Sequence, residues 1–426
     1  MKSKFIIVAF ILFLSSGLSQ SIFGNFQEPD KFSNLVDIPR LEVDIPKEPR
    51  IWEIDVSVLR DSIAAQNGKA MIGFKAPESD RMMHKSGIRT ALSAEQFKEA
   101  LEMIESKGVE ILYIYRTFGA ASVKMDPDIV YDLHDHPMID YIEIPLPFKI
   151  QLACFTNDSY VRSSTQITPW GVDMVKAPQA WNVTKGSGAK VYVIDTGMED
   201  HVDLPDRPSE NCGGLFDGCS DGPTYHGTHV SGTLMALDND IGVVGVSPAL
   251  NDNDVYSWAA CCPSTGSCYS NNIAAGIDAA ILDEVDVINM SFGGPSQHTG
   301  VANAVAVAWN NGIVMVAAAG NLPESEQGGD PVYPAGYTQV IGVSGLKSDG
   351  SFANTSPCII PSYNEALKSN HGPHVEISAP FWALSTVGTN QYEDENDGWC
   401  GTSMAAPHVA GTVALMKSIN PELSPS

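Results

Sequence analysis

Basic residues and long apolar runs are both scarce in this sequence. Only 25 lysines and arginines stand against 51 aspartates and glutamates, so the formal net charge is −26. This balance argues against a basic surface that binds nucleic acid, because such binding depends on lysine and arginine neutralising phosphates. Beyond the N-terminus no apolar stretch is long enough to cross a bilayer, and the chain shows no internal repeat. With hydrophobic residues at 43%, the composition favours a soluble globular protein.

The N-terminus has the features of a secretory signal. Lys2 and Lys4 precede the short apolar run FIIVAFILFL, and small residues follow it. A basic start, an apolar core and small residues define such signals, so residues 1–19 are predicted to be removed by cleavage near Ser19. We therefore expect a secreted, extracellular protein without stable membrane insertion. Residues 20–68 are predicted to be a leader segment, to which the sequence assigns no role.

Eight cysteines fit an oxidising compartment, where disulfides persist. No two of them form a C-x-x-C pair, which argues against a structural zinc site. The pairing stays open at this stage, and Cys212 with Cys219 is the simplest local guess. The cysteines are Cys154, Cys212, Cys219, Cys261, Cys262, Cys268, Cys358 and Cys400.

Residues 69–150 are predicted to form a small α+β domain of the ferredoxin-like type. Ser93 and Gln96 make a capping box, in which each side chain binds the other residue's backbone N–H at a helix start. The helix that follows has apolar residues on one face and ends at Gly108. The order strand, helix, strand, strand, helix, strand, typical of that fold, is expected at residues 69–75, 97–107, 109–115, 120–125, 126–133 and 138–144.

From about residue 165 the pattern changes to apolar strands that alternate with helices. Such alternation predicts a mostly parallel sheet with helices on both faces, in which active sites lie at the carboxyl ends of strands. Asp195, Ser291 and Asn321 each stand at or just after the end of a predicted strand. The sequence therefore predicts an α/β domain over residues 166–426, with 151–165 as the linker from the small domain.

Four short motifs in this domain carry residues suited to amide hydrolysis by serine. They are VIDTG at 193–197, HGTHVSGT at 226–233, AAAGN at 317–321 and GTSMAAPHVAG at 401–411. That chemistry needs a nucleophile, a base, a carboxylate that orients the base and donors for the developing oxyanion. The aspartate, histidine and serine motifs occur in the chain order of one protease family. On these motifs the sequence resembles the subtilisin-like serine proteases, or subtilases.

The resemblance implies a role for each motif residue. Asp195 would orient the imidazole, His226 would act as general base and acid, and Ser403 would be the nucleophile. Asn321 would donate its side-chain amide to the oxyanion, together with the backbone N–H of Ser403 at a helix N-terminus. A helix cap at Ser403 and turn residues at Asp195 and Asn321 are simpler interpretations, but they do not account for the ordered set of motifs.

Neighbouring residues are expected to have structural roles. His229, one turn along the helix of the histidine motif, is predicted to be packed and neutral. Thr402, Pro407 and His408 are predicted to shape and pack the helix of the serine motif rather than to react. Cys400 is predicted to be half of a disulfide or a buried thiol.

The resemblance also implies a substrate-binding segment made of Ser291, Phe292, Gly293 and Gly294. This segment would pair with substrate backbone as an added strand, which glycines allow by letting another backbone approach closely. Gly320 is assigned to the same groove. A broad, mainly apolar pocket is implied, with protein and peptide substrates as the partners.

A structural Ca²⁺ site is implied by the same resemblance. Hard oxygen donors that include one strong carboxylate suit Ca²⁺. A solvated acidic loop at 237–243 is the alternative. The ligands would be the side chains of Gln166, Asp203 and Asn239 and the backbone carbonyls of Leu237, Ile241 and Val243.

Subtilases carry an N-terminal propeptide of the fold predicted for residues 69–150, which assists folding and inhibits the enzyme. By resemblance, the tail at about 145–165 would occupy the active-site cleft, with a processing site in the linker 151–165. The protein is thus expected to be a zymogen, to have its own propeptide as an intramolecular inhibitor and to act as a monomer.

Four features depart from the family pattern. The segment at 253–262 replaces a basic strand end beside the substrate groove, and 358–374 looks like an insertion. APFW at 379–382 has an aromatic residue where the family has glycine, and the chain stops at NPELSPS, where the family continues. The domain 166–426 is therefore expected to be truncated. A catalytically idle peptide-binding relative or an inactive fragment is the alternative function.

Overall fold

The computed structural model describes residues 32, 34–35, 55–75, 92–150, 160–161, 165–206, 210–211, 225–323, 325–354, 359–360, 365–388, 390–393 and 399–425. The chain divides into two units, 1–36 and 37–426, and every element named below lies in the second. The predicted signal at 1–19 and the predicted Cys212–Cys219 pair fall outside the described residues. Across the described ranges, no helix is both long and apolar enough to span a membrane.

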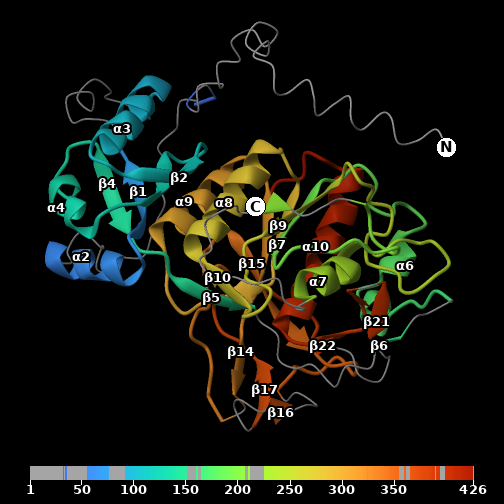
Figure 1. Ribbon diagram of the computed structural model, residues 1–426. Coiled ribbons are helices and arrows are strands. Elements are labelled where there is room, and N and C mark those ends of the chain that lie inside the picture. Colours follow the sequence, from blue (N-terminus) through green and yellow to red (C-terminus); the bar gives the residue numbers. More distant parts are fainter. Residues whose placement is uncertain are drawn as a thin grey trace, which may run out of the picture. The chain divides into compact units, whose positions relative to one another are not determined.

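The first element group is an antiparallel sheet with helices, as predicted for residues 69–150 (Figure 1). Its strand order is β2-β3-β1-β4, and all three pairings are antiparallel. This is the arrangement of a ferredoxin-like fold, so the predicted fold class is confirmed. The elements are β1 (Lys69–Phe74), α3 (Ala94–Ser106), β2 (Glu110–Tyr115), β3 (Ala120–Lys124), the 3-10 turn η3 (Pro127–Ile129), α4 (Val130–Leu133) and β4 (Ile139–Glu143).

The predicted capping box explains where α3 begins. The Ser93 hydroxyl accepts from Gln96 N at 3.2 Å, and Gln96 Oε1 accepts from Ser93 N at 3.0 Å. Phe97, Leu101 and Ile104 lie on one face of the helix and are fully buried. The local sequence therefore sets both the start of the helix and the face that packs on the sheet.

A helix at residues 56–65 was not predicted. The helix α2 (Val56–Ala65) lies in the segment for which the sequence indicated no element, and Asp55 caps it by accepting from Ser57 N at 2.8 Å. Only Leu59 and Ile63 are buried along it. Two apolar residues one turn apart give too weak a pattern to identify a helix from sequence. Packing against the small sheet supplies the remaining stability of the helix.

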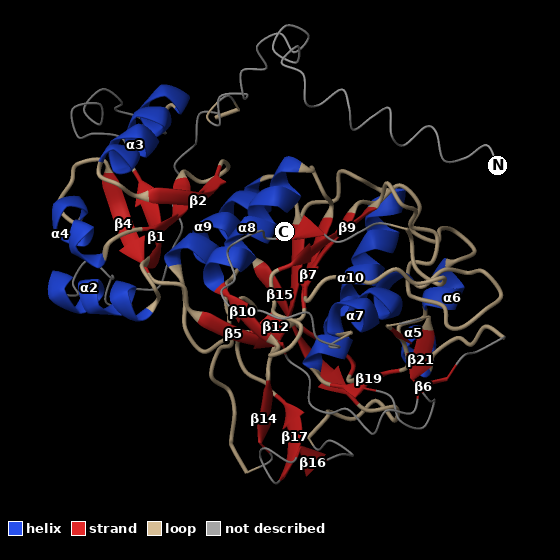
Figure 2. Cartoon of the chain, in the orientation of Figure 1, coloured by secondary structure: helices blue, strands red, loops and turns tan. Residues whose placement is uncertain are grey.

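The second group is a parallel sheet in the order β18-β15-β13-β11-β7-β9-β8, as the alternating pattern predicted. Figure 2 labels three of its strands, β15, β7 and β9. Every neighbouring pair in it runs parallel. Its strands are β7 (Val191–Asp195), β8 (Glu210–Asn211), β9 (Val255–Ala259), β11 (Val287–Met290), β13 (Val314–Ala318), β15 (Val340–Leu346) and β18 (Ile377–Pro380).

Helices cover both faces of this sheet, because successive strand residues point to opposite sides. Ile194 and Met290 belong to one buried cluster, which α8 and α9 complete, whereas Val193 and Val316 belong to another, which α7 and α10 complete. Figure 1 shows the two helix pairs on either side of the strands. These helices are α7 (His226–Met235), α8 (Ser270–Leu282), α9 (Thr299–Asn310) and α10 (Thr402–Ile419).

Short helices and strands lie around the parallel sheet. The predicted insertion at 358–374 contributes β16 and β17, and β17 pairs antiparallel with β14, where Asn321 lies opposite Ser369. The remaining elements are α5 (Trp170–Met174), α6 (Ala177–Ala180), β5 (Pro147–Ile150), β6 (Tyr160–Val161), β10 (Ser267–Tyr269), β12 (Phe292–Gly293), β14 (Asn321–Pro323), β16 (Ile359–Ile360), β17 (Glu365–Ser369), β19 (Trp382–Ala383), β20 (Thr386–Val387), β21 (Gln391–Glu393) and β22 (Trp399–Cys400).

A disulfide joins Cys261 to Cys268, with an S–S distance of 2.00 Å. It links the residues just after β9 to β10 and is completely buried. Cys262 and Cys400 are also disulfide-bonded, so the prediction that Cys400 is a half-cystine or buried thiol is confirmed. These bonds agree with the expectation of an oxidising compartment.

Met290→Ala tests the importance of the buried cluster between the parallel sheet and the helices α8 and α9. Met290 is fully buried in the central strand β11, so its truncation leaves a cavity and is expected to cost about 2–5 kcal/mol of unfolding free energy. The measurement is the midpoint of thermal unfolding at a fixed scan rate. Leu282→Ala is the control, since Leu282 ends α8 and is 49% exposed. Equal shifts in the two variants would contradict the assigned core.

Candidate active site

Three of the predicted site residues lie at the carboxyl ends of adjacent strands. Asp195 is the last residue of β7, Ser291 directly follows β11, and Asn321 follows β13 after two residues. Because these strands are neighbours and parallel, their ends meet at one edge of the sheet. The edge position is the one predicted from the strand pattern.

The carboxylate of Asp195 is paired with the imidazole of His226. His226 Nδ1 lies 2.7 Å from Asp195 Oδ1, and neither side chain is exposed. The same Oδ1 accepts from Thr196 N at 2.7 Å. Within the described part of the chain, His226 Nε2 is buried and has no hydrogen-bond partner. A carboxylate at Nδ1 favours the tautomer in which Nε2 is the basic nitrogen.

Gly227 allows α7 to start close enough to Asp195 for this contact. A Cβ atom at Gly227 would lie 2.1 Å from the carbonyl oxygen of Gly197, so no other residue fits there without displacement. Gly227 N also donates to Thr196 Oγ1 at 2.9 Å. The glycine of the histidine motif therefore brings the helix start against the loop after β7.

Ser403 and Ser291 are joined by a reciprocal pair of hydrogen bonds. Ser403 Oγ donates to Ser291 O at 2.7 Å, and Ser291 Oγ donates to Ser403 O at 2.9 Å. Pro407 explains the second bond, because it has no N–H to donate to the carbonyl four residues earlier in α10. The Ser291 hydroxyl takes over this role, and the two segments are thereby locked together.

Thr402 joins the start of α10 to Asn321. Asn321 Oδ1 accepts from Thr402 N at 3.0 Å and from Thr402 Oγ1 at 3.2 Å. Gly320 N donates to Thr402 Oγ1 at 3.1 Å, and Gly320 has a φ of +105°, a conformation that glycine adopts readily. The sequence predicted only a packing role for Thr402. Its direct contact with a predicted oxyanion donor is a finding of the tertiary structure.

His229 is packed and neutral, as predicted. Its ring stacks on Trp399 with centroids 4.7 Å apart and an interplanar angle of 5°. Complete burial, and then the nearby His226, lower the pKa of His229 to about 3. Burial likewise lowers the pKa of His408 to about 4. Neither ring therefore carries a charge near neutral pH.

The predicted substrate-binding segment is paired with a strand of the same chain. β12 (Phe292–Gly293) pairs antiparallel with β5 (Pro147–Ile150), and β5 pairs on its other edge with β10, so β5 lies between them (Figure 2). The Phe148 side chain is buried and meets the Phe292 ring edge-on, with centroids 6.4 Å apart. Gly294, the last predicted residue, exchanges two backbone hydrogen bonds with Tyr333.

Four of the predicted calcium ligands gather at one point. The Gln166 side-chain amide nitrogen faces three backbone carbonyls, those of Leu237 at 2.6 Å, Val243 at 3.4 Å and Ile241 at 3.5 Å. A 180° flip of this amide exchanges Nε2 for Oε1 and leaves the shape of the side chain unchanged. Four oxygens would then surround one position, which is the donor set of a hard cation.

The other two predicted ligands border this cluster. Asp203 is fully buried, its Oδ2 accepts from Val243 N at 3.0 Å, and its Oδ1 has no partner within the described ranges. Burial raises the pKa of Asp203 to about 7. Asn239 Oδ1 accepts from Ile241 N at 3.1 Å. A buried carboxylate with an unsatisfied oxygen beside converging carbonyls fits a calcium ion, which would restore the lost solvation.

Comparison with known proteins agrees with these observations. A family model described as the Subtilase family matches residues 186–426. The chain is 35% identical over 344 residues to Subtilisin amylosacchariticus of Bacillus subtilis subsp. amylosacchariticus. This alignment covers 79% of this chain and 80% of the relative. It is 34% identical over 358 residues to M-protease of Shouchella clausii (84% of this chain, 83% of the relative), and 33% identical over 343 residues to a thermostable alkaline protease of Halalkalibacterium halodurans (78% and 84%). The chain therefore belongs to the subtilase family.

Proposed function

We propose that this chain is a secreted serine endopeptidase, made as a zymogen that processes itself and hydrolysing peptide bonds in proteins and peptides. The observation that carries the proposal is the buried 2.7 Å contact between Asp195 and His226, with Nε2 as the ring atom without a partner in the described residues. Serine catalysis requires that pairing, because the carboxylate orients the base and stabilises its protonated form. The relatives named as subtilisins and alkaline proteases support the same function.

Ser403 is the proposed nucleophile. Its hydroxyl donates to Ser291 O, so attack begins with rotation of the hydroxyl from Ser291 O towards His226 Nε2. His226 takes the proton as Oγ bonds to the substrate carbonyl carbon, and gives it to the departing amine. Water then hydrolyses the acyl-enzyme with His226 again acting as the base.

The oxyanion is proposed to bind between Asn321 and Ser403. Two donors of Thr402 engage the carbonyl end of the Asn321 side chain, which makes its amide end the part that serves an oxyanion. The backbone N–H of Ser403 is the second donor, because first-turn amides of α10 lack acceptors within the helix. Donors held in place before the reaction need no reorganisation as charge develops.

The groove around β12 is proposed to bind substrate as an added strand. β5 of this chain already has backbone pairing on both edges, which supports its role as the inhibitory tail of a propeptide. An external peptide would pair with the same edges after the tail has been released. The burial of Phe148 against Phe292 supports an apolar pocket beside the backbone groove.

We also propose that the cradle formed by Gln166, Leu237, Ile241 and Val243, together with Asp203 and Asn239, binds a structural Ca²⁺ ion. A bound cation would hold the loop 237–243 against the segment that precedes α5. This site lies apart from the residues proposed for the chemistry, so its contribution is to stability.

Ser403→Ala is expected to abolish both peptidase activity and self-processing. The variant should accumulate as an unprocessed precursor, because the proposed acyl-enzyme cannot form without the hydroxyl. The measurements are the size of the secreted protein and labelling of the wild-type serine by a fluorophosphonate. Normal maturation of the variant would contradict self-processing, and an unlabelled, inactive wild-type protein would favour the idle peptide-binding alternative.

Asn321→Ala is expected to lower kcat with little change in KM. The loss should be about 2.7–4 kcal/mol of transition-state stabilisation, a value that comes from the corresponding donor in subtilisin itself and not from this structure. Steady-state kinetics on a peptide substrate measure it. Asn311→Ala, an exposed asparagine after α9, is the matched control and should leave kcat unchanged. An unaltered kcat in Asn321→Ala would remove Asn321 from the mechanism.

Chelation of calcium is expected to lower the thermal midpoint of the protein, measured in the Ser403→Ala background to prevent self-digestion. Saturation at 100 times Kd stabilises a fold by about 2.7 kcal/mol, which sets the scale of the effect. Asp203→Asn should have a lower thermal midpoint than the parent protein, and the chelator should not lower it further. Asp240→Asn is the control, because Asp240 is exposed in the same loop and its φ of +71° suits asparagine. A response to chelator that persists in Asp203→Asn would refute the site.

A further inference from the structure

The pairing of β5 has a fixed register on both edges. On one edge Lys149 lies opposite Gly293 and Ile150 opposite Phe292. On the other edge Phe148 lies opposite Cys268, and Ile150 N donates to Gly266 O at 3.1 Å. A slip by one residue would turn every side chain of β5 to the opposite face, so the buried Phe148 and the exposed Lys149 specify this alignment.

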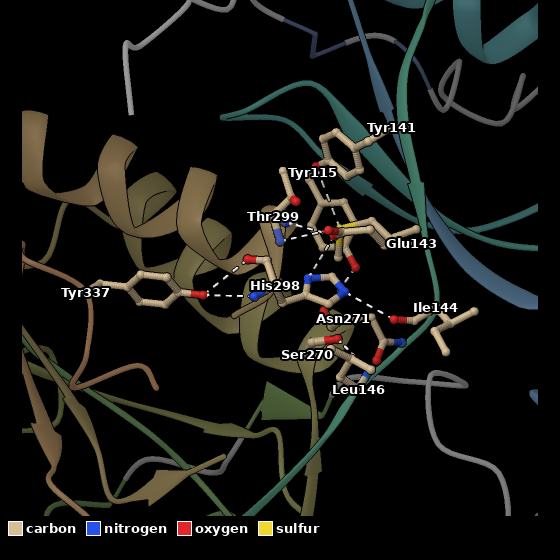
Figure 3. Close-up of polar contacts among 12 residues, drawn as sticks. Tyr115, Tyr141, Glu143, Ile144, Leu146, Ser270, Asn271, His298, Thr299 and Tyr337 are labelled. Carbon is tan, nitrogen blue, oxygen red and sulfur yellow. Dashed lines mark hydrogen bonds and ion pairs between the residues drawn. The ribbon is translucent and has the colours of Figure 1, made fainter. Parts of the chain in front are cut away.

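The chain just before β5 is anchored to the helices of the parallel-sheet domain (Figure 3). Glu143 accepts from Thr299 N at 2.9 Å and Gly300 N at 3.2 Å at the start of α9, and His298 Nδ1 lies 3.1 Å from it. The first-turn amides of a helix favour such a carboxylate.

Leu146 provides a second anchor, two residues before the buried Phe148. It exchanges two hydrogen bonds with Ser270 at the start of α8, since Leu146 N donates to Ser270 Oγ at 2.9 Å and Ser270 N donates to Leu146 O at 3.0 Å. These two anchors and the pairing with β12 together hold β5 in its register.

From this register we propose that the processing bond of the zymogen is Gln151–Leu152. In an antiparallel pair the residue numbers rise on one strand as they fall on the other, so continuing the register of Ile150 with Phe292 by one residue assigns Ser291 to residue 151. Ser291 O is the atom to which Ser403 Oγ donates at 2.7 Å. We therefore assign the residue that follows Ile150 as the one whose carbonyl the nucleophile attacks.

The proposal rests on the proposed function and follows its chemistry. Ser403 Oγ bonds to the carbonyl carbon of Gln151, the C–N bond to Leu152 breaks, and His226 carries the serine proton to the nitrogen of Leu152. Water then releases Gln151 as a free carboxylate. Register selects the bond, and Phe148 holds the register through its burial against Phe292.

The termini created by processing test the bond directly. N-terminal sequencing of the secreted wild-type protein should give Leu-Ala-Cys-Phe-Thr, and mass spectrometry of the released pro-segment should give a C-terminus at Gln151. Any other pro-segment C-terminus in an active, processed protein overturns the proposal while leaving the proposed function intact. A wild-type protein that is neither processed nor labelled by a fluorophosphonate overturns both.

Insertion of one alanine between Ile150 and Gln151 separates register from side-chain recognition. If register selects the bond, cleavage follows the inserted alanine and the new N-terminus begins with Gln-Leu-Ala. If the glutamine side chain selects it, cleavage still follows the glutamine and the proposal fails. The full-length chain is used in both cases, with Ser403→Ala as the variant in which neither product forms.

Phe148→Ala tests the anchor of the register. Loss of this buried side chain should slow the appearance of mature protein by about tenfold or more, because the tail spends less time docked between β10 and β12. Tyr131→Ala is the matched control, since Tyr131 is an aromatic residue of α4 that is 50% exposed. Equal processing rates for the two variants would refute the role of Phe148.

Discussion

The contact between the Asp195 carboxylate and His226 Nδ1 is the interaction on which the site depends. Both side chains are completely buried, so separating them would take the imidazole partner from a buried carboxylate that otherwise accepts from Thr196 N. The fold meets this demand by ending β7 at Asp195, starting α7 at His226 and placing Gly227 where a side chain would strike Gly197. The position of α7 on the sheet is thus tied to the chemistry proposed for its first residue.

The start of α10 is fixed by contacts of the same kind. Pro407 leaves the Ser403 carbonyl without its helical donor, and Ser291 supplies one while accepting the Ser403 hydroxyl. Thr402 binds Asn321 through two donors. The residues that follow β11 and β13 and the start of α10 therefore hold one another in place. The proposed nucleophile and oxyanion donor thus do not depend on a single loop for their positions.

The pairing of β5 supports the proposal that it belongs to a pro-segment lying where a substrate would bind. β12, which follows the end of β11, and β10 each provide a backbone edge that pairs with β5, and the disulfide between Cys261 and Cys268 joins β10 to the segment just after β9. A strand inserted between two such edges satisfies its own backbone groups on both sides. Inhibition and substrate binding would then be two uses of one set of hydrogen-bonding groups.

The sequence by itself determined the elements whose patterns are local: the capping box at Ser93, the alternating strands and helices, and the motifs that carry Asp195, His226 and Ser403. Only the tertiary structure decided which residues meet across long stretches of chain. The pairing of β5 between β10 and β12, the Cys261–Cys268 bond and the contact of Thr402 with Asn321 had no local signal, because each joins segments whose spacing says nothing about their contact. The helix α2 escaped prediction for a related reason, since two buried residues do not define an amphipathic face until a sheet is present to cover it.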